Sequence, residues 1–279
     1  MRQFIVSDIH GFANLYYSIM HYLDNISKSE EIELYINGDL IGYQSKDSAD
    51  ILLDVMKRIG EYNPQFHITY LGGDQEYLMG RAFYNLGEDG NGNNWYHNGG
   101  RAIFANLGDR KAREDVRDFI YNLSVYQKLK TRLDGKKIIL VHAARPFSGS
   151  NNLKIGEMGN KVYYTVTGKK SCPCLFPVKK KNSENEITIL GHVPTCDEKG
   201  FNYDVNERIL RIDGGASKYL EGHKEYNHFP LVELTPSFFR ILTFNDENNI
   251  TSGYYLGVDN FMRELDPDEL EKAKSYIKM

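Results

Sequence analysis

Residues 3–11 have the sequence QFIVSDIHG, in which a short apolar run ends directly at an acid, a histidine and a glycine. The run 3–7 predicts a buried strand, and the apolar spacing of residues 11–26 predicts a helix after it. Asp8 and His10 lie two residues apart at the strand end, so their side chains point the same way, and Gly11 allows a tight turn. Alone, this Asp-x-His pair fits either a metal site or an ordinary helix N-cap.

The same arrangement recurs at the ends of four more predicted strands, which span 33–37, 66–71, 136–142 and 187–190. The segments at these ends are Asn37-Gly38-Asp39, Gly72-Gly73-Asp74-Gln75-Glu76, Val141-His142-Ala143-Ala144 and Gly191-His192-Val193-Pro194-Thr195. Because the carboxyl ends of strands in an α/β sheet converge on one crevice, we expect their Asp and His side chains to meet. The alternative, a set of unrelated helix caps and core histidines, requires the same coincidence at all five strand ends.

The candidate metal ligands are Asp8, His10, Asp39, Asp74, His142 and His192. Mixed Asp and His ligands suit divalent Mn, Fe or Zn better than Ca or Mg, which prefer shells of oxygen. This set exceeds what one four-coordinate ion needs, so we expect two divalent ions, with manganese first and iron or zinc as alternatives. Two ions about 3.5–4 Å apart can generate a hydroxide nucleophile and hold phosphoryl oxygens.

Strands alternate with helices in the first half of the chain, with helices expected over 49–59, 76–84, 95–107 and 113–123. In the second half, an Asp134-Gly135 turn joins strands 125–133 and 136–142, and more strands are expected at 187–190, 209–212, 231–234 and 239–243. A closing helix over 265–279 begins with Asp266 as N-cap, Pro267 and Glu269. This pattern predicts an α/β layer architecture in a single domain over residues 1–279, with a loop insertion at about 146–186.

The chain has 279 residues, 41% of them hydrophobic, and a net charge of −4. This composition is that of an ordinary globular protein and gives no global positive field for nucleic acid or anionic membranes. Three cysteines in so long a chain argue against a disulfide scaffold and for a reducing compartment. The first residues do not fit a signal peptide and no apolar run reaches about 18 residues, so the expected location is the cytoplasm.

Several motifs together make the sequence similar to a known superfamily. They are Asp8-x-His10-Gly11, Gly38-Asp39, Gly73-Asp74-x-Glu76, Trp95-x-x-Asn98-Gly99-Gly100, His142-Ala143, Gly191-His192 with Pro194, and Ile212-Asp213-Gly214-Gly215. Over about residues 1–217 they resemble the calcineurin-like metallophosphoesterases, and within them the phosphoprotein phosphatase branch, with its bacterial serine/threonine phosphatases and symmetrical dinucleoside tetraphosphatases. The resemblance implies a four-layer α-β-β-α metallophosphatase sandwich of two mixed sheets flanked by helices. It also implies that Asp8 and His10 hold one metal, that Asp39 bridges both, and that Asp74, His142 and His192 hold the other.

The sequence departs from the family pattern at the residues that act on the leaving group. The pattern G-D-x-x-D-R-G appears as GDLIGYQ over 38–44, and G-N-H-E appears as Gly73-Asp74-Gln75-Glu76. The family's general-acid His is therefore Gln75, its Asp partner is Gly42, its phosphate-binding Arg is Tyr43, and a metal-binding Asn is Asp74. Gln75 can donate a hydrogen bond but cannot give up a proton, so good leaving groups are favoured. Arg145 fits either a replacement phosphate-binding guanidinium or a surface arginine.

The expected function is that of a dinuclear metal-dependent phosphoesterase, with Asp39, Asp74 and Gln75 at the catalytic position. It would hydrolyse phosphomonoesters or phosphoanhydrides with good leaving groups by attack of metal-bound hydroxide. The substrate would be a phosphorylated small molecule, a nucleotide or a phosphoprotein, while the net charge gives no support to nucleic acid and no membrane partner is expected. The alternative is a catalytically impaired relative, a pseudophosphatase, that keeps the metal centre for ligand or protein binding.

Two further features of the sequence stay unassigned. The aromatic residues Tyr84, Trp95 and Tyr96 fit either stacking on a nucleobase or packing in the core. Cys172 and Cys174 form a C-x-C pair, which is by itself a weak indication of metal or redox chemistry.

Overall fold

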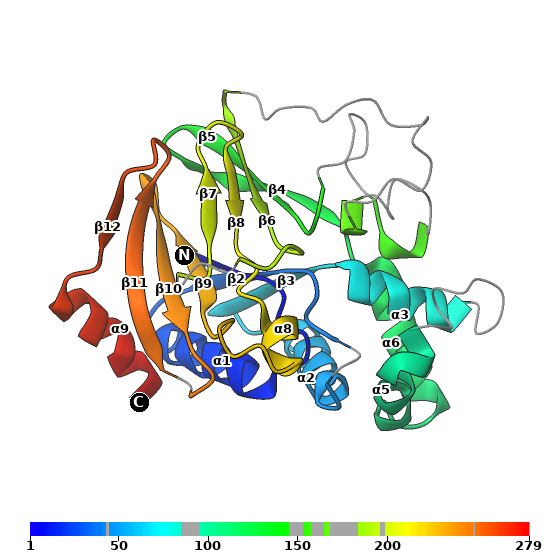
Figure 1. Cartoon of the computed structure of the whole chain (residues 1–279). Coiled ribbons are helices and arrows are strands. Elements are labelled where there is room, and N and C mark those ends of the chain that lie inside the picture. Colours follow the sequence, from blue (N-terminus) through cyan, green and yellow to red (C-terminus); the bar gives the residue numbers. More distant parts are fainter. Residues whose placement is uncertain are drawn as a thin grey trace.

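The computed structural model describes residues 1–42, 45–84, 95–144, 153–157, 165–167, 184–195, 199–247 and 249–278, and in this part of the chain two mixed sheets face each other (Figure 1). The larger sheet has seven strands in the order β12-β11-β10-β9-β1-β2-β3, and the smaller has five in the order β4-β5-β6-β8-β7. The larger contains β1 (Arg2–Val6), β2 (Ile32–Asn37), β3 (Phe66–Leu71), β9 (Phe229–Leu234), β10 (Phe238–Phe244), β11 (Ile250–Gly257) and β12 (Met262–Glu264). The smaller contains β4 (Tyr126–Leu133), β5 (Lys136–Val141), β6 (Glu186–Leu190), β7 (Asn202–Asp204) and β8 (Ile209–Arg211).

The strands that carry the predicted site are parallel neighbours within each sheet. In the larger sheet β1 pairs parallel with β2, and β2 with β3. In the smaller sheet β5 pairs parallel with β6. Parallel neighbours end at the same edge of a sheet, so these five strands direct the residues after them to two facing edges.

The core lies in two layers because side chains alternate across each strand. Ile5 of β1 points into the space between the sheets, where it packs in one cluster with Leu140 of β5 and Ile189 of β6. Phe4 and Val6 of the same strand point the other way, into the cluster that packs against the helices. Both clusters are buried, which fixes the register of β1 and with it the position of the loop that follows.

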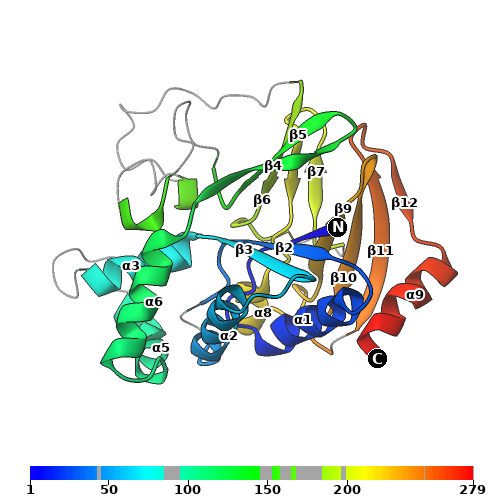
Figure 2. The same ribbon diagram turned by 180° about the vertical axis from the view of Figure 1, so that it is seen from behind.

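Helices cover the outer face of the larger sheet and the side where β3 ends (Figures 1 and 2). The helices are α1 (Ala13–Ser27), α2 (Ser48–Gly60), α3 (Asp74–Tyr84), α5 (Arg101–Asn106), α6 (Arg110–Asn122), α8 (Ala216–Leu220) and α9 (Pro267–Lys278), with a π-helix at Tyr96–Gly100 and a 3-10 turn at Ile155–Glu157. The predicted α/β sandwich of two mixed sheets flanked by helices is therefore confirmed. None of the helices in the described ranges is both long and apolar enough to cross a membrane.

Local details of the prediction are also confirmed. The hairpin turn has positive φ at both Asp134 (47°) and Gly135 (73°), as a tight two-residue hairpin requires. At the start of α9 the Glu269 N–H donates to Asp266 Oδ1 at 2.9 Å, and the Asp266 N–H donates to Glu269 Oε2 at 3.0 Å, a reciprocal capping box. The sequence did not predict β7, β11, β12 or α8, and the single domain with an insertion at 146–186 stays a prediction, since most of that insertion lies outside the described residues.

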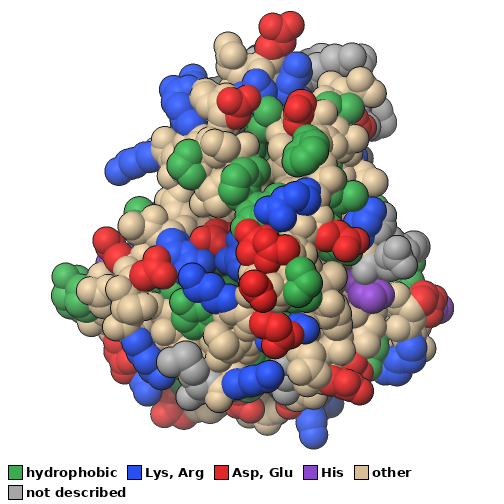
Figure 3. Space-filling model, turned by 90° about the vertical axis from the view of Figure 1, so that its left-hand side faces the viewer, with side chains coloured by type: hydrophobic (Ala, Val, Ile, Leu, Met, Phe, Trp, Pro, Cys, Tyr) green, Lys and Arg blue, Asp and Glu red, His purple; other side chains and the backbone are tan. Residues whose placement is uncertain are grey.

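The end of the molecule formed by β12 and α9 carries acidic and basic side chains side by side (Figure 3). Opposite charges also pair on the strands of the larger sheet and on α9: Glu233 accepts from Arg2 Nε at 2.7 Å and from Arg240 at 3.0 Å, and Arg263 lies 3.4 Å from Glu269. Such pairing neutralises these side chains locally, in line with the small net charge of −4.

Candidate metal centre

The loops after β1 and β2 run side by side and fix each other through backbone hydrogen bonds. The Asp8 N–H donates to the Gly38 carbonyl at 3.1 Å, and the His10 N–H donates to the Asp39 carbonyl at 2.9 Å. Asp8, His10 and Asp39 all adopt left-handed backbone angles, with φ of 58°, 51° and 50°. Each such angle costs about 1–2 kcal/mol in a non-glycine residue, and strained residues of this kind gather at functional sites.

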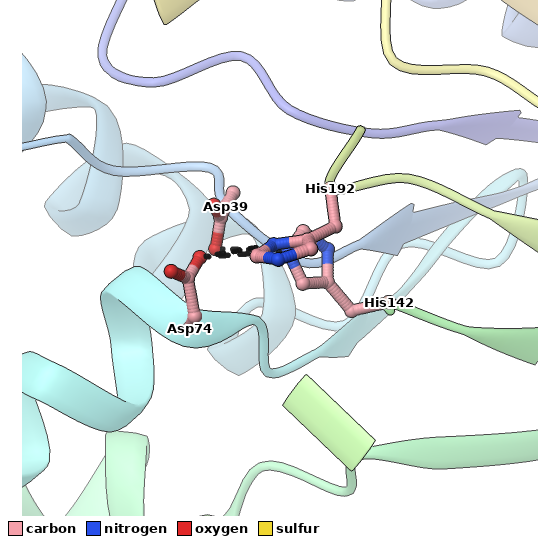
Figure 4. Close-up of side chains that lie close together, drawn as sticks. All are labelled: Asp39, Asp74, His142 and His192. Atoms are coloured by element: carbon pink, nitrogen blue, oxygen red, sulfur yellow. Dashed lines mark ion pairs between the residues drawn. The ribbon is translucent and has the colours of Figure 1, made fainter. Parts of the chain in front are cut away.

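The predicted ligands meet in two groups that share Asp39. Asp39, Asp74, His142 and His192 each offer a ligand atom, and these atoms lie within 4.8 Å of one another, as do those of a second group formed by Asp8, His10 and Asp39. Figure 4 shows the first group, with the side chains pointing toward one another from the loops after β2, β5 and β6 and from the start of α3. All six predicted ligands are therefore brought together, while their roles as ligands stay predictions.

His142 is oriented so that one ring nitrogen faces the carboxylates. Its Nδ1 lies 3.0 Å from the Asn37 carbonyl, which can only accept, so Nδ1 carries a proton and Nε2 is the ring nitrogen turned toward the carboxylates. Nε2 lies 3.3 Å from Asp39 Oδ1 and 3.6 Å from Asp74 Oδ1. Burial lowers the pKa of His142, but the carboxylates of Asp39 and Asp8 outweigh it and raise this pKa well above 6.5. Both His142 Nε2 and Asp74 Oδ1 are buried without a hydrogen-bond partner, and a divalent cation that displaces the Nε2 proton would satisfy both.

The second group is arranged around the His10 ring. His10 Nε2 lies 3.7 Å from Asp8 Oδ1 and 3.6 Å from Asp39 Oδ2. Burial disfavours the charged imidazolium, but the carboxylates of Asp8 and Asp39 outweigh it and raise the pKa of His10 to about 9. Burial and the neighbouring Asp74 carboxylate raise the pKa of Asp39 well above its usual value. Buried carboxylates held so close together repel each other, and a cation between them relieves that repulsion.

Two glycines of the motifs leave room for the carboxylates. A Cβ on Gly73 would lie 2.2 Å from Asp39 Oδ1, and a Cβ on Gly191 would lie 2.0 Å from Asp8 Oδ2. The His192 N–H, next to Gly191, donates to both oxygens of Asp8 at 3.0 and 3.1 Å. Glycine is therefore required beside Asp74 and His192 for a steric reason, because a side chain at either position would displace a predicted ligand.

Glu76 holds the two ligand-bearing loops together, which its place in the sequence motif did not reveal. Its fully buried carboxylate accepts from the backbone N–H groups of Asp39 (2.9 Å) and Gly73 (2.7 Å). It also accepts from the Ile41 N–H at 3.3 Å and from the Tyr70 hydroxyl at 2.6 Å. The Gln75 N–H adds a bond to Asp39 Oδ1 at 3.0 Å. Glu76 therefore positions Asp39, the predicted ligand that both groups share.

Other residues singled out in the sequence are placed less completely. Gly42 is described, and its backbone N–H bonds to Ser48 Oγ at 3.0 Å. Trp95 is 2% exposed, so its ring packs in the core and does not offer a stacking surface. Tyr43, Arg145, Cys172, Cys174 and the Tyr84 side chain lie outside the described residues, and the roles considered for them stay predictions.

Comparison with known proteins gives a likeness of fold and no family. No family model and no curated protein matches the sequence. A structure of a cold-active protein tyrosine phosphatase is similar with a TM-score of 0.48 and 12% identity, over 96% of this chain and 80% of that one. A predicted phosphoesterase from Streptococcus pneumoniae TIGR4 is similar with a TM-score of 0.35 and 13% identity, over 95% and 96%. A hypothetical protein from Pyrococcus horikoshii OT3 has a TM-score of 0.43 and 14% identity, over 99% and 96%.

At these low scores the likenesses assign no role to any residue of this chain. Fold and site together define an α/β sandwich protein with a candidate centre for divalent metal ions, built from buried Asp and His side chains.

Proposed function

We propose that the protein is a phosphoesterase that works with two divalent cations, manganese first and iron or zinc as alternatives. The observation that supports this most directly is that two groups of Asp and His side chains share one carboxylate, Asp39. When bound, two such cations act as Lewis acids on phosphoryl oxygens and lower the pKa of water enough to make it a nucleophile near neutral pH.

The chain's own residues divide into two tasks. Asp8 and His10 would hold one cation, Asp74, His142 and His192 the other, and Asp39 both. Gln75, whose backbone N–H already binds Asp39 at 3.0 Å, would face the phosphoryl group. Since an amide donates hydrogen bonds but transfers no proton, the leaving group has to depart as a stable anion. The favoured substrates are therefore aryl phosphates, phosphoanhydrides or phosphotyrosine, in a small molecule, a nucleotide or a protein, and we place the enzyme in the cytoplasm.

A second candidate function is a metal-binding protein without appreciable hydrolysis. Two features favour it: the amide of Gln75 at the acid position, and a third carboxylate, Asp74, among the ligands. Three carboxylates against two divalent ions leave a formal charge of about +1, which holds metal firmly but attracts phosphate weakly. Such a protein would use the centre for structure or for binding a ligand.

The test compares hydrolysis of p-nitrophenyl phosphate, a phosphoserine peptide and a dinucleoside tetraphosphate by the Mn-loaded protein. Asp39→Asn serves as the blank, and Asp115→Asn as the matched control, because Asp115 pairs with Lys111 on α6 and is 53% exposed. We expect turnover of the aryl phosphate or the anhydride that is lost in Asp39→Asn and kept in Asp115→Asn. Metal binding without turnover of any of the three substrates would contradict the phosphoesterase and favour the second candidate.

A further inference from the structure

Trp95, the single tryptophan of the chain, is buried and contacts Gln75, the residue after the predicted ligand Asp74. It stands just before the π-helix Tyr96–Gly100, a type of distortion frequent at functional sites. A Cβ on Gly100 would lie 2.3 Å from the indole ring, so the ring rests on bare backbone there, and Phe104 packs edge-on at a centroid distance of 6.0 Å. With 2% of its surface exposed, the ring has no room to turn.

The indole N–H of Trp95 donates to the side-chain oxygen of Gln75 at 3.1 Å. Because an indole nitrogen only donates, the atom that faces it has to be the amide oxygen and not the nitrogen. The NH2 group of Gln75 is therefore the end directed away from Trp95, and no hydrogen bond from it to any other described residue is formed. The same residue follows Asp74, and its backbone N–H donates to Asp39 Oδ1, so Gln75 begins at the border of the candidate metal centre.

We propose that Trp95 is a positioning residue that fixes Gln75 as a neutral hydrogen-bond donor to a phosphoryl oxygen of the bound phosphate or phosphate ester. This inference rests on the proposed phosphoesterase function and narrows its substrates. An amide donor holds the phosphoryl group equally well across the neutral and mildly alkaline range, since it does not titrate, but it supplies no proton to the departing oxygen. The pair therefore selects phenolate and phosphate leaving groups over alkoxides.

The first test follows the fluorescence of Trp95, which reports on the surroundings of this one ring because the chain has no other tryptophan. The probe is inorganic phosphate, titrated into the metal-loaded protein. We expect a saturable change of the Trp95 emission in the wild type, and none in Gln75→Met, where the indole N–H has lost its partner. An equal emission change in wild type and Gln75→Met would overturn the contact between Gln75 and phosphate.

The second test is a double-mutant cycle of Trp95→Phe and Gln75→Met, read as kcat and KM for p-nitrophenyl phosphate. Each single change is expected to lower kcat/KM about five- to tenfold, the effect of one hydrogen bond. The double variant should be no slower than Gln75→Met alone, because Trp95 acts through Gln75. Equal losses from Trp95→Phe in both backgrounds would show that Trp95 acts only through packing and would overturn the inference.

One control variant and the activity of the wild type keep the tests separate. Phe104→Leu loosens the packing around Trp95 without touching its hydrogen bond, so its kcat/KM should stay within twofold of wild type. A loss in Phe104→Leu as large as that in Trp95→Phe would again contradict a role for the hydrogen bond. If the wild type hydrolyses no substrate, the proposed function fails while the phosphate titration still decides the Gln75 contact. If the wild type is active but the cycle is additive, only the inference fails.

Discussion

Replacing Glu76 by glutamine tests whether this buried carboxylate holds the metal centre in shape. The two oxygens of Glu76 accept four hydrogen bonds, two each, from Asp39, Gly73, Ile41 and Tyr70. A glutamine offers one oxygen and one NH2 group. If the oxygen stays with the Asp39 and Gly73 N–H groups, the NH2 group can donate to the Tyr70 hydroxyl, which can also accept, but it leaves the Ile41 N–H without an acceptor. At least one hydrogen bond is then lost, and the bonds that remain have a neutral partner in place of a charged one.

The cost can be worked from these contacts. A hydrogen bond to a charged group contributes about 1.5–3 kcal/mol, and an unsatisfied buried N–H costs about 1–3 kcal/mol. We therefore expect Glu76→Gln to lower the free energy of unfolding by about 4 kcal/mol, a large part of the ~5–15 kcal/mol typical of a domain. Tyr70→Phe removes only one of the four bonds and should cost about 1.5 kcal/mol.

The assay is urea denaturation of all variants, followed by calorimetric titration with Mn²⁺. The matched control is Glu114→Gln, which removes an exposed i,i+4 pair with Arg110 and should change stability by less than about 0.5 kcal/mol. Because Glu76 positions the backbone of Asp39, the ligand common to both groups, affinity for metal should fall together with stability. A Glu76→Gln variant within about 1 kcal/mol of wild type, with unchanged Mn²⁺ affinity, would refute this reasoning.

Three further predictions concern the same centre. Gly73→Ala should abolish tight metal binding in calorimetry, because the new Cβ would lie 2.2 Å from Asp39 Oδ1. The control Gly60→Ala, whose Cβ would have no atom within 4 Å, should bind metal as the wild type does. Equal metal binding by the two variants would contradict the steric argument. Saturation with Mn²⁺ at a hundredfold excess over Kd should stabilise the fold by about 2.7 kcal/mol and raise Tm by about 5 °C or more, a shift that a chelator reverses and that Asp39→Asn lacks. Since the pKa of His10 is raised from 6.5 to about 9, metal has to displace a proton below that pH. The apparent Zn²⁺ affinity should therefore rise about tenfold per pH unit between pH 7 and 9, and a flat profile in titrations at several pH values would argue against His10 as a ligand.

The sequence predicted the elements that local patterns encode. Apolar runs located β1, β2 and β3 within a residue or so, and the Asp266 capping box located α9. The convergence of five strand ends on one site also followed from the sequence, because each end carried its own Asp or His. These features are set by residues close together in the sequence, and such local patterns of apolar, turn and capping residues can be identified from the sequence alone.

The features that the sequence did not predict depend on contacts between distant residues. Strands β9 to β12 join the larger sheet beside β1. Which strands become neighbours depends on side-chain packing between them, and the sequence of any single strand does not reveal it. Strands of three residues, such as β7 and β12, are too short to show alternation. The bond from Trp95 to Gln75 spans twenty positions of the chain, and the oxygens of Glu76 reach back across more than thirty. No local pattern records where such side chains meet.

The bond between Trp95 and Gln75 bears on the proposed function, in which Gln75 stands where the motif it resembles has a histidine. A histidine at position 75 would face the indole N–H, and a donor in that position disfavours the protonated imidazolium that a general acid needs. Gly42 provides no carboxylate to offset this, and its backbone is occupied by Ser48. An amide, in contrast, accepts from the indole with one end and keeps a donor at the other. Residues 75 and 95 are therefore consistent with each other and with the proposed release of a stable anion.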